Sequence, residues 1–180
     1  VVPGGHGSTS SPAGATVTTT RLFAPYDRGG VPTAGVVAHR SGSCFTTSIT
    51  VPAATAYRCF AGNSILDPCF VAPSSRHTLD CYAQPWSRAV RLQVTAALPE
   101  PVDSLTITRP WALELVGGLR CVATNGTPTV LRGIAMTYRC ADGAAGLLRT
   151  SGATLLARYA ATDGAVRDLA VTTVWRTATS

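Results

Sequence analysis

The sequence predicts an all-β fold: an antiparallel β-sandwich or small barrel, stapled by three disulfides and preceded by a flexible N-terminal tail. Short runs of alternating apolar and polar residues recur along the chain, and 17 glycines and 12 prolines interrupt them. No segment keeps apolar residues at helical spacing over several turns without an intervening Gly or Pro. Six cysteines in a chain of 180 residues predict the three disulfides.

Two regions of different composition are expected: a flexible N-terminal tail or spacer over residues 1–40 and a disulfide-stabilised β domain over residues 41–180. The first half of the tail is rich in Gly, Ser, Thr and Pro and contains no apolar residue bulkier than valine. Such a segment buries too little surface to offset the conformational entropy lost on ordering. The second half carries Leu22, Phe23 and Tyr26, which are able to dock on the domain.

The expected strands are the segments in which apolar and polar residues alternate. They are, in chain order, residues 45–51, 90–96, 111–115, 119–123, 134–140, 155–159 and 169–175. In the clearest of them Val90, Leu92 and Val94 share one face, and Arg91 and Gln93 share the other. This two-residue period is that of a strand with one buried face.

Glycine-containing turns separate several of these strands. Gly117-Gly118 lies between two alternating runs and predicts a tight hairpin, because glycine tolerates positive φ. Thr162-Asp163-Gly164 predicts another. Consecutive hairpins favour antiparallel pairing. Alanine-rich segments such as 141–148 could accommodate one short helix within the all-β fold.

The segment 59–86 departs from the alternating pattern. It is dense in Pro, Asn, Asp and Ser, it includes the turn-forming pair Asp67-Pro68, and it contains two internal cysteines. The composition predicts a long irregular loop pinned by disulfides, and long loops of this kind are often functional. The candidate site is therefore sought in this segment.

The cysteines indicate disulfides in an oxidising compartment. No C-x-x-C pair is present and the chain has only 3 histidines, which disfavours zinc and redox motifs. Six cysteines permit fifteen pairings, of which we expect the one that joins sequential neighbours: Cys44–Cys59, Cys69–Cys81 and Cys121–Cys140. The protein is accordingly expected to be secreted or exposed at the cell surface, with any export signal already removed.

The charge of the chain indicates a class of partner. All 15 basic residues are arginines, against 9 acids, giving a net charge of +6 and a pI near 9.3. The arginines are scattered singly, as on solvated strand faces, whereas nucleic-acid-binding proteins concentrate basic residues with stacking aromatics. No nucleic-acid partner is expected, and no apolar run is long enough to span a membrane. Positive charge favours anionic surfaces such as cell-wall polymers.

No catalytic residue, metal-ligand set or cofactor is assigned from the sequence. The acids are dispersed, and the only pair that a disulfide would bring together is Asp67 and Asp80. His77 lies near Ser74, but no G-x-S-x-G elbow accompanies it. Phosphate-binding and dinucleotide-binding glycine motifs are missing.

Aromatic residues beside prolines and polar residues are the better candidates for binding. An exposed aromatic ring can stack on a sugar face or a proline, whereas a buried one contributes to the core. Trp111 and Trp175 are expected in the core. The candidate binding residues are Tyr57, Asp67, His77, Tyr82 and Trp86.

Residues 43–176 resemble a group of uncharacterised six-cysteine proteins of actinobacteria that are secreted or associated with the envelope. The resemblance is carried by four segments: Tyr57-Arg58-Cys59, Gly62 to Phe70, Pro110 to Leu115, and Tyr138-Arg139-Cys140. It implies an extracytoplasmic location and three disulfides. It implies no activity and no catalytic residue.

The leading functional hypothesis is a non-enzymatic extracellular domain that binds a cell-wall polymer or an envelope protein, or acts at the envelope as a structural element. One alternative is a small secreted hydrolase with its site in the 59–86 loop, built on Asp67 and His77. A further alternative is a subunit of a surface assembly, for which exposed strand edges would be the structural indication. Neither the ligand nor the oligomeric state follows from the sequence.

Overall fold

The computed structural model describes residues 16–101, 107–148 and 154–178 and confirms the all-β prediction, since these residues contain strands and no helix. The strands are β1 (Thr19–Phe23), β2 (Val36–Thr47), β3 (Ala56–Ala61), β4 (Ser64–Ala72), β5 (Ser75–Cys81), β6 (Ala89–Val94), β7 (Ala112–Leu115), β8 (Leu119–Ala123), β9 (Thr129–Leu131), β10 (Ile134–Met136), β11 (Tyr138–Cys140), β12 (Gly143–Leu148), β13 (Leu156–Ala161) and β14 (Val166–Thr177).

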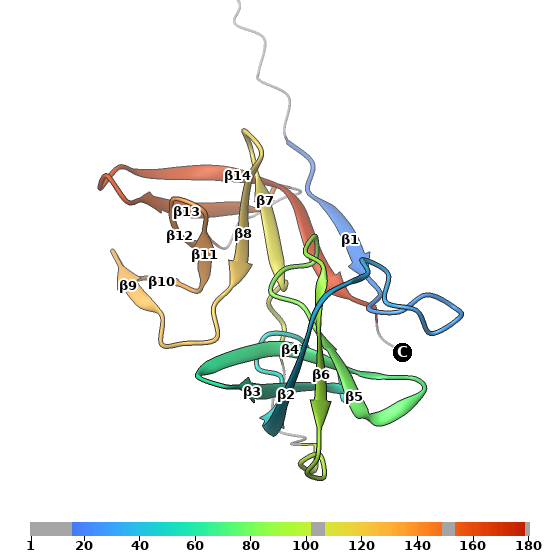
Figure 1. Cartoon of the computed structure of the whole chain (residues 1–180). Coiled ribbons are helices and arrows are strands. Elements are labelled where there is room, and N and C mark those ends of the chain that lie inside the picture. Colours follow the sequence, from blue (N-terminus) through green and yellow to red (C-terminus); the bar gives the residue numbers. More distant parts are fainter. Residues whose placement is uncertain (1–15, 102–106, 149–153, 179–180) are drawn as a thin grey trace, which may run out of the picture.

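The strands form two small barrels (Figure 1). Strands β2 to β6 close the N-terminal barrel, in which sequential strands are antiparallel and β2 pairs with β6 in parallel. Parallel closure follows from geometry, because the first and last strands of an odd-numbered meander run in the same direction. Strands β7, β8 and β11 to β14 form the C-terminal barrel, which closes where β14 pairs antiparallel with β7.

Two elements lie outside these rings. Strand β1 pairs in parallel with β14 on the outside of the C-terminal barrel. The β9–β10 hairpin is inserted between β8 and β11. The described part of the chain therefore runs from β1 on the C-terminal barrel to the N-terminal barrel and then back to the C-terminal barrel.

The glycine turns are where the sequence predicts them. Leu115 pairs with Leu119 across the β7–β8 hairpin, and Gly117 and Gly118 have φ values of 85° and 79°. Gly164, in the β13–β14 turn, has a φ of 89°. These backbone conformations are costly for residues that carry a Cβ.

Residues 141–148, which the sequence leaves open to a short helix, form no helix, because most of this segment is strand β12. Its small residues serve close packing instead. A Cβ at Gly143 would overlap the carbonyl oxygen of Ala160, and a Cβ at Gly146 would overlap that of Ala135. Composition alone does not distinguish an alanine-rich helix from a strand that needs small residues.

The irregular loop expected over residues 59–86 is also wrong. Strands β4 and β5 occupy most of it, and the Asp67-Pro68 pair lies inside β4 rather than in a turn. Conversely, the expected strand 45–51 ends at Thr47, and the following residues lead into β3. The polar residues that suggested a loop pack against neighbouring segments, as described below.

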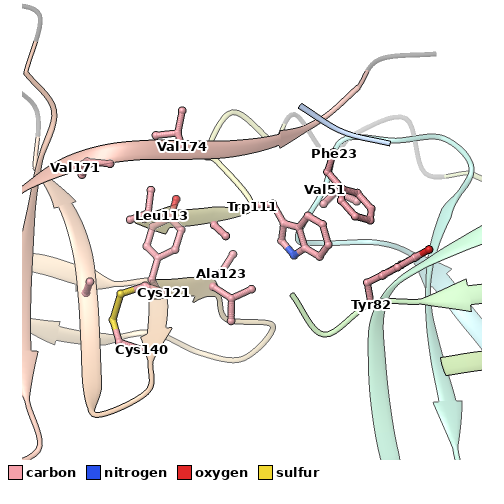
Figure 2. Close-up of a cluster of buried hydrophobic side chains, with 14 of the residues drawn as sticks. Phe23, Val51, Tyr82, Trp111, Leu113, Cys121, Ala123, Cys140, Val171 and Val174 are labelled. Carbon is pink, nitrogen blue, oxygen red and sulfur yellow. A yellow bond between two sulfur atoms is a disulfide. The ribbon is translucent and has the colours of Figure 1, made fainter. Parts of the chain in front are cut away.

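The tail boundary expected at residue 40 differs from the structure, because β1 and the first part of β2 precede it. Residues 1–15 lie outside the described residues. Phe23, at the end of β1, is 5% exposed, and its ring centroid lies 5.0 Å from those of Tyr82 and Trp111 (Figure 2). The segment that contains β1 therefore belongs to the folded core.

All three predicted disulfides are confirmed: Cys44–Cys59, Cys69–Cys81 and Cys121–Cys140. Each joins two residues directly opposite one another on adjacent antiparallel strands. The first two lie in the N-terminal barrel and the third in the C-terminal barrel, so each barrel carries its own cross-link.

Buried apolar side chains form two clusters. One fills the N-terminal barrel around Leu79 and Leu92. The other fills the C-terminal barrel and continues to the junction, where Phe23, Trp111 and Tyr82 meet (Figure 2). This shared core fixes the barrels against one another and so positions the cleft between them.

Candidate functional site

The candidate site is a cleft with a volume of about 440 Å³ where the two barrels meet. The N-terminal barrel contributes residues of β4 and of the β5–β6 region, and the C-terminal barrel contributes β8, the loop after it and β11. The lining residues are Asn63, Ile65, Leu66, Asp67, Cys81, Tyr82, Ala83, Ser87, Arg88, Val90, Val122, Ala123, Thr124, Asn125 and Arg139. We call this concavity the cleft.

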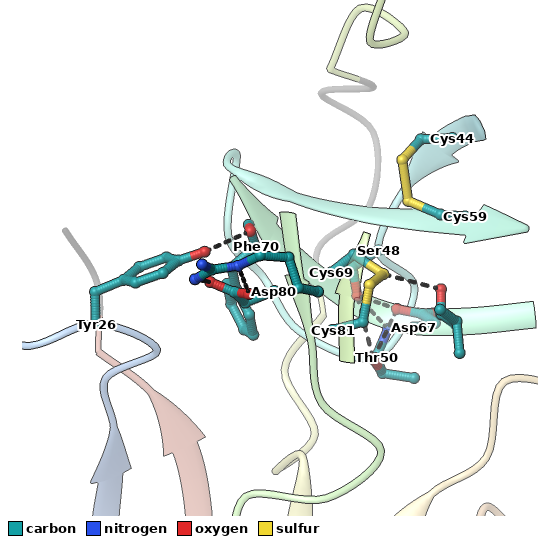
Figure 3. The surroundings of a disulfide bond; sticks show 12 residues. Tyr26, Cys44, Ser48, Thr50, Cys59, Asp67, Cys69, Phe70, Asp80 and Cys81 are labelled. Carbon is teal, nitrogen blue, oxygen red and sulfur yellow. Dashed lines mark hydrogen bonds and ion pairs between the residues drawn. A yellow bond between two sulfur atoms is a disulfide. The ribbon is translucent and has the colours of Figure 1, made fainter. Parts of the chain in front are cut away.

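Asp67, which belongs to the wall of the cleft on the side of the N-terminal barrel, carries a buried carboxylate. The side chain of Asp67 has no exposed surface. Asp67 Oδ1 accepts hydrogen bonds from the hydroxyls of Ser48, at 2.5 Å, and Thr50, at 3.0 Å (Figure 3). Asp67 Oδ2 accepts one from the Ile49 N–H at 3.3 Å. Burial raises the pKa of Asp67 above its usual value of 3.8, although these hydrogen bonds and Arg58 oppose the shift.

Two arginines connect the barrels beside the cleft. Arg58 Nε lies 3.9 Å from Asp67 Oδ2, and Arg58 donates a 2.8 Å hydrogen bond to the carbonyl of Asn125. Arg109 donates to the carbonyls of Ile49 and Thr124, at 3.3 and 3.2 Å. The two adjacent carbonyls after β8 are thus held by guanidinium groups, which fixes this wall of the cleft relative to the N-terminal barrel.

Two further arginines give the cleft a positive surface. Arg88 and Arg139 line it and are both exposed. Arg88 donates a 2.7 Å hydrogen bond to the carbonyl of Val36. Asp67 is the one carboxylate among the lining residues, and its side chain is turned away from solvent. The exposed charge of the cleft is therefore positive.

The structure brings two of the five predicted binding residues to the cleft, Asp67 and Tyr82. Tyr82 is almost fully buried, and its hydroxyl donates to the carbonyl of Pro25. Tyr57 lies in the core of the N-terminal barrel with 4% exposure, so it presents no surface to a ligand. His77 is exposed on β5, outside the cleft.

Trp86, the fifth predicted residue, lies at the junction of the barrels rather than in the cleft. Its ring packs edge-on against Trp175, with centroids 6.1 Å apart, and the Arg120 guanidinium lies 5.0 Å from its centroid. Trp175 Nε1 donates to Glu114. Trp111 is buried as expected, whereas Trp86 and Trp175 are half-buried. Trp86 thus helps to join the barrels.

The residues required by the hydrolase hypothesis do not meet in the cleft, because Asp67 lines it and His77 does not. Asp80 does not pair with Asp67 either. It is buried and accepts two 2.9 Å hydrogen bonds from Arg91, and Figure 3 shows the two carboxylates on either side of the Cys69–Cys81 disulfide. The cleft therefore contains neither a histidine base nor a carboxylate pair.

In residues 16–101, 107–148 and 154–178, no group of three or more His, Cys, Asp or Glu side chains is placed to hold a metal ion. The same residues form no helix long and apolar enough to cross a membrane. The outer edge of β1, whose described pairing is with β14 alone, is a strand edge of the kind that the surface-assembly hypothesis requires.

Several residues of the site were not predicted. Ser48 and Thr50 fall on the expected polar face of segment 45–51, yet both are buried against Asp67. Asn125 is in an Asn-Gly-Thr pattern that suggests a turn, and Arg139 belongs to a set of scattered arginines. No signal in the sequence places these residues together, because the closure of the two barrels does so.

No protein-family model, curated protein or solved structure matches the chain. The function therefore has to be inferred from the cleft and from the residues around it.

Proposed function

We propose that the protein is a non-enzymatic extracellular binding domain that acts at the cell envelope and holds an anionic envelope polymer in the cleft. The observation that carries the proposal is the positive concavity between two closed barrels, with Arg88 and Arg139 exposed on its surface. Guanidinium groups bind carboxylate and phosphate through paired, charge-assisted hydrogen bonds. Clefts lined by one sign of charge also concentrate ligands of the opposite charge.

The extracellular location is part of the proposal. Three disulfides account for all six cysteines, and such cross-links persist in oxidising compartments. A net charge of +6 favours adhesion to acidic wall polymers. The resemblance to envelope-associated proteins of actinobacteria points to the same location.

The test is retention of the protein on purified cell walls over a titration with salt. We expect retention at low ionic strength that is lost as salt screens the charges. Replacing both cleft arginines (Arg88→Gln with Arg139→Gln) should release the protein at a lower salt concentration. No retention of the wild type at low ionic strength would contradict the proposal.

A charge-matched variant separates the cleft from net charge. Arg28→Gln with Arg76→Gln removes the same two charges at exposed positions outside the cleft. We expect this variant to be retained nearly as well as the wild type. Equal loss of retention in both double variants would mean that net charge, and not the cleft, determines binding.

A further inference from the structure

Three exposed apolar side chains lie side by side on the N-terminal barrel. Phe45 on β2, Phe60 on β3 and Ile65 on β4 are each 42% exposed. The rings of Phe45 and Phe60 are stacked, with centroids 4.4 Å apart and an interplanar angle of 23°. We call these residues the aromatic strip.

The aromatic strip is continuous with the cleft. Phe60 is directly opposite Ile65 in the pairing of β3 with β4, and Ile65 lines the cleft. The strip therefore runs from β2 across two strands to the edge of the concavity. A ligand that fills the cleft and extends toward β2 would meet the two rings.

Arg58 holds the strip and the cleft wall in fixed relation. Its guanidinium centre lies 5.5 Å from the centroid of Phe45, and the same group donates to the carbonyl of Asn125 in the cleft wall. A cation over an aromatic face and a hydrogen bond to a carbonyl both restrict the guanidinium. The aromatic strip and the cleft wall that contains Asn125 thus form one preorganised surface.

The rings of the aromatic strip do not contribute to the core of the barrel. Cys59, the neighbour of Phe60 in β3, points inward and is fully buried. Phe60 is on the outer face, where two stacked rings remain in contact with water. Arg58 contacts Phe45, and Asn63 and Asn125 line the cleft together with Ile65. An exposed apolar patch next to polar residues commonly marks a binding surface.

We propose that the ligand in the cleft is an acidic glycan and that the aromatic strip is the subsite on which one of its sugar rings packs. This inference rests on the proposed function. The apolar C–H face of a pyranose fits an exposed aromatic ring. The side-chain amides of Asn63 and Asn125 supply donors and acceptors for sugar hydroxyls. Arg88 and Arg139 supply the positive charge that binds carboxylates along the glycan.

Calorimetric titration of the whole chain with three probes tests the proposal. Oligogalacturonate carries sugar rings and charge, inorganic polyphosphate carries charge without sugar, and a neutral glucan oligosaccharide carries sugar without charge. We expect the wild type to bind oligogalacturonate most tightly. Phe60→Ala should weaken oligogalacturonate binding about tenfold, the loss expected for one aromatic contact, and leave polyphosphate binding unchanged.

Two matched variants control the result. Phe60→Tyr keeps the ring and should retain the affinity for oligogalacturonate. Val130→Ala removes an exposed apolar side chain on β9, outside the cleft and the strip, and should have no effect. If Phe60→Ala fails to fold, intermolecular NOEs between sugar protons and the Phe60 ring of the wild type supply the same test, and their absence overturns the proposal.

The outcomes separate this inference from the proposed function. Equal weakening of oligogalacturonate and polyphosphate by Phe60→Ala, or no weakening of either, overturns the sugar subsite and leaves the cleft proposal standing. Failure of the wild type to bind oligogalacturonate overturns the acidic glycan as ligand, whereas retention on cell walls decides the proposed function independently. We expect Arg139→Gln to bind both charged probes more weakly than the wild type does. Unchanged binding would overturn the role of the cleft in the proposed function and in this inference.

Discussion

Asp67 carries a carboxyl group whose protonation is coupled to the stability of the fold. Burial raises its pKa above 3.8, so between 3.8 and the folded-state pKa the folded protein binds more protons at this site than the unfolded chain does. The contribution of Asp67 to stability is therefore fully present below 3.8 and is lost as the pH rises through the folded-state pKa.

Asp67→Asn exposes this dependence, because the amide does not titrate. We expect the unfolding free energy of the wild type, measured relative to that of Asp67→Asn by urea titration, to increase as the pH is lowered from 7 toward 4. Titrating groups that both proteins share contribute equally to the two unfolding free energies, so their contributions cancel in the difference. One of them is Asp168, whose pKa is lowered by Arg158. A difference that stays constant or shrinks on acidification would contradict the burial of this carboxylate.

Phe23 packs at the centre of the aromatic cluster that joins the barrels. Its ring centroid lies 5.0 Å from both Tyr82 and Trp111 and 6.0 Å from Phe70. Phe23→Ala should lower the unfolding free energy by about 3–5 kcal/mol, since it removes a buried aromatic ring and leaves a cavity. The neighbouring Leu22→Ala, at a position 66% exposed, should change it by less than about 0.5 kcal/mol. Comparable losses in the two variants would show that β1 does not insert Phe23 into the core.

At the scale of elements, β2 passes very close to its neighbours. A Cβ at Gly42 would overlap the carbonyl oxygen of Phe60 and lie 2.9 Å from Leu92 Cδ1. Gly42→Ala should therefore destabilise the N-terminal barrel by about 1–3 kcal/mol, measured by thermal or urea unfolding. Gly126→Ala is the matched control, because nothing lies within 4 Å of its Cβ position. Wild-type stability in Gly42→Ala would refute the close packing of β2 against β3.

The sequence predicts those elements whose pattern is local. The β7–β8 hairpin follows from Gly117-Gly118 between two alternating runs, and the buried face of β6 follows from Leu92 and Val94. The pairing of neighbouring cysteines also holds, because hairpins bring sequential neighbours together. In each case the physical cause lies within about twenty residues of chain.

Elements that depend on tertiary contacts are not predicted. Asp67 reads as a loop former, but inside β4 its carboxylate accepts hydrogen bonds from Ser48 and Thr50, which lie in the connection between β2 and β3, where the sequence pattern places them on a solvent-facing side of a strand. The sequence marks Phe23 as able to dock, but it does not identify the partners, because Tyr82 and Trp111 belong to other segments. The residues of the cleft could not be predicted for the same reason, because only the closure of the barrels brings Arg139 to the cleft.

At the scale of the whole molecule, the two barrels together form a cleft that neither contains alone. Residues of β4 and of the β5–β6 region form one wall of the cleft, and β8, β11 and the loop after β8 form the other. The shared core around Trp111 and the hydrogen bonds of Arg58 and Arg109 fix the walls relative to one another. A rigid cleft reduces the entropy lost when a ligand binds.

The most direct test of the binding account is a map of backbone amide chemical shifts during titration with anionic polysaccharide released from purified cell walls. We expect the largest shifts in the cleft and on the aromatic strip, at Phe60, Asn63, Asn125 and Arg139. Residues 162–165, in the exposed β13–β14 turn, should not shift. Shifts centred on that turn, or none anywhere at saturating polysaccharide, would contradict the account.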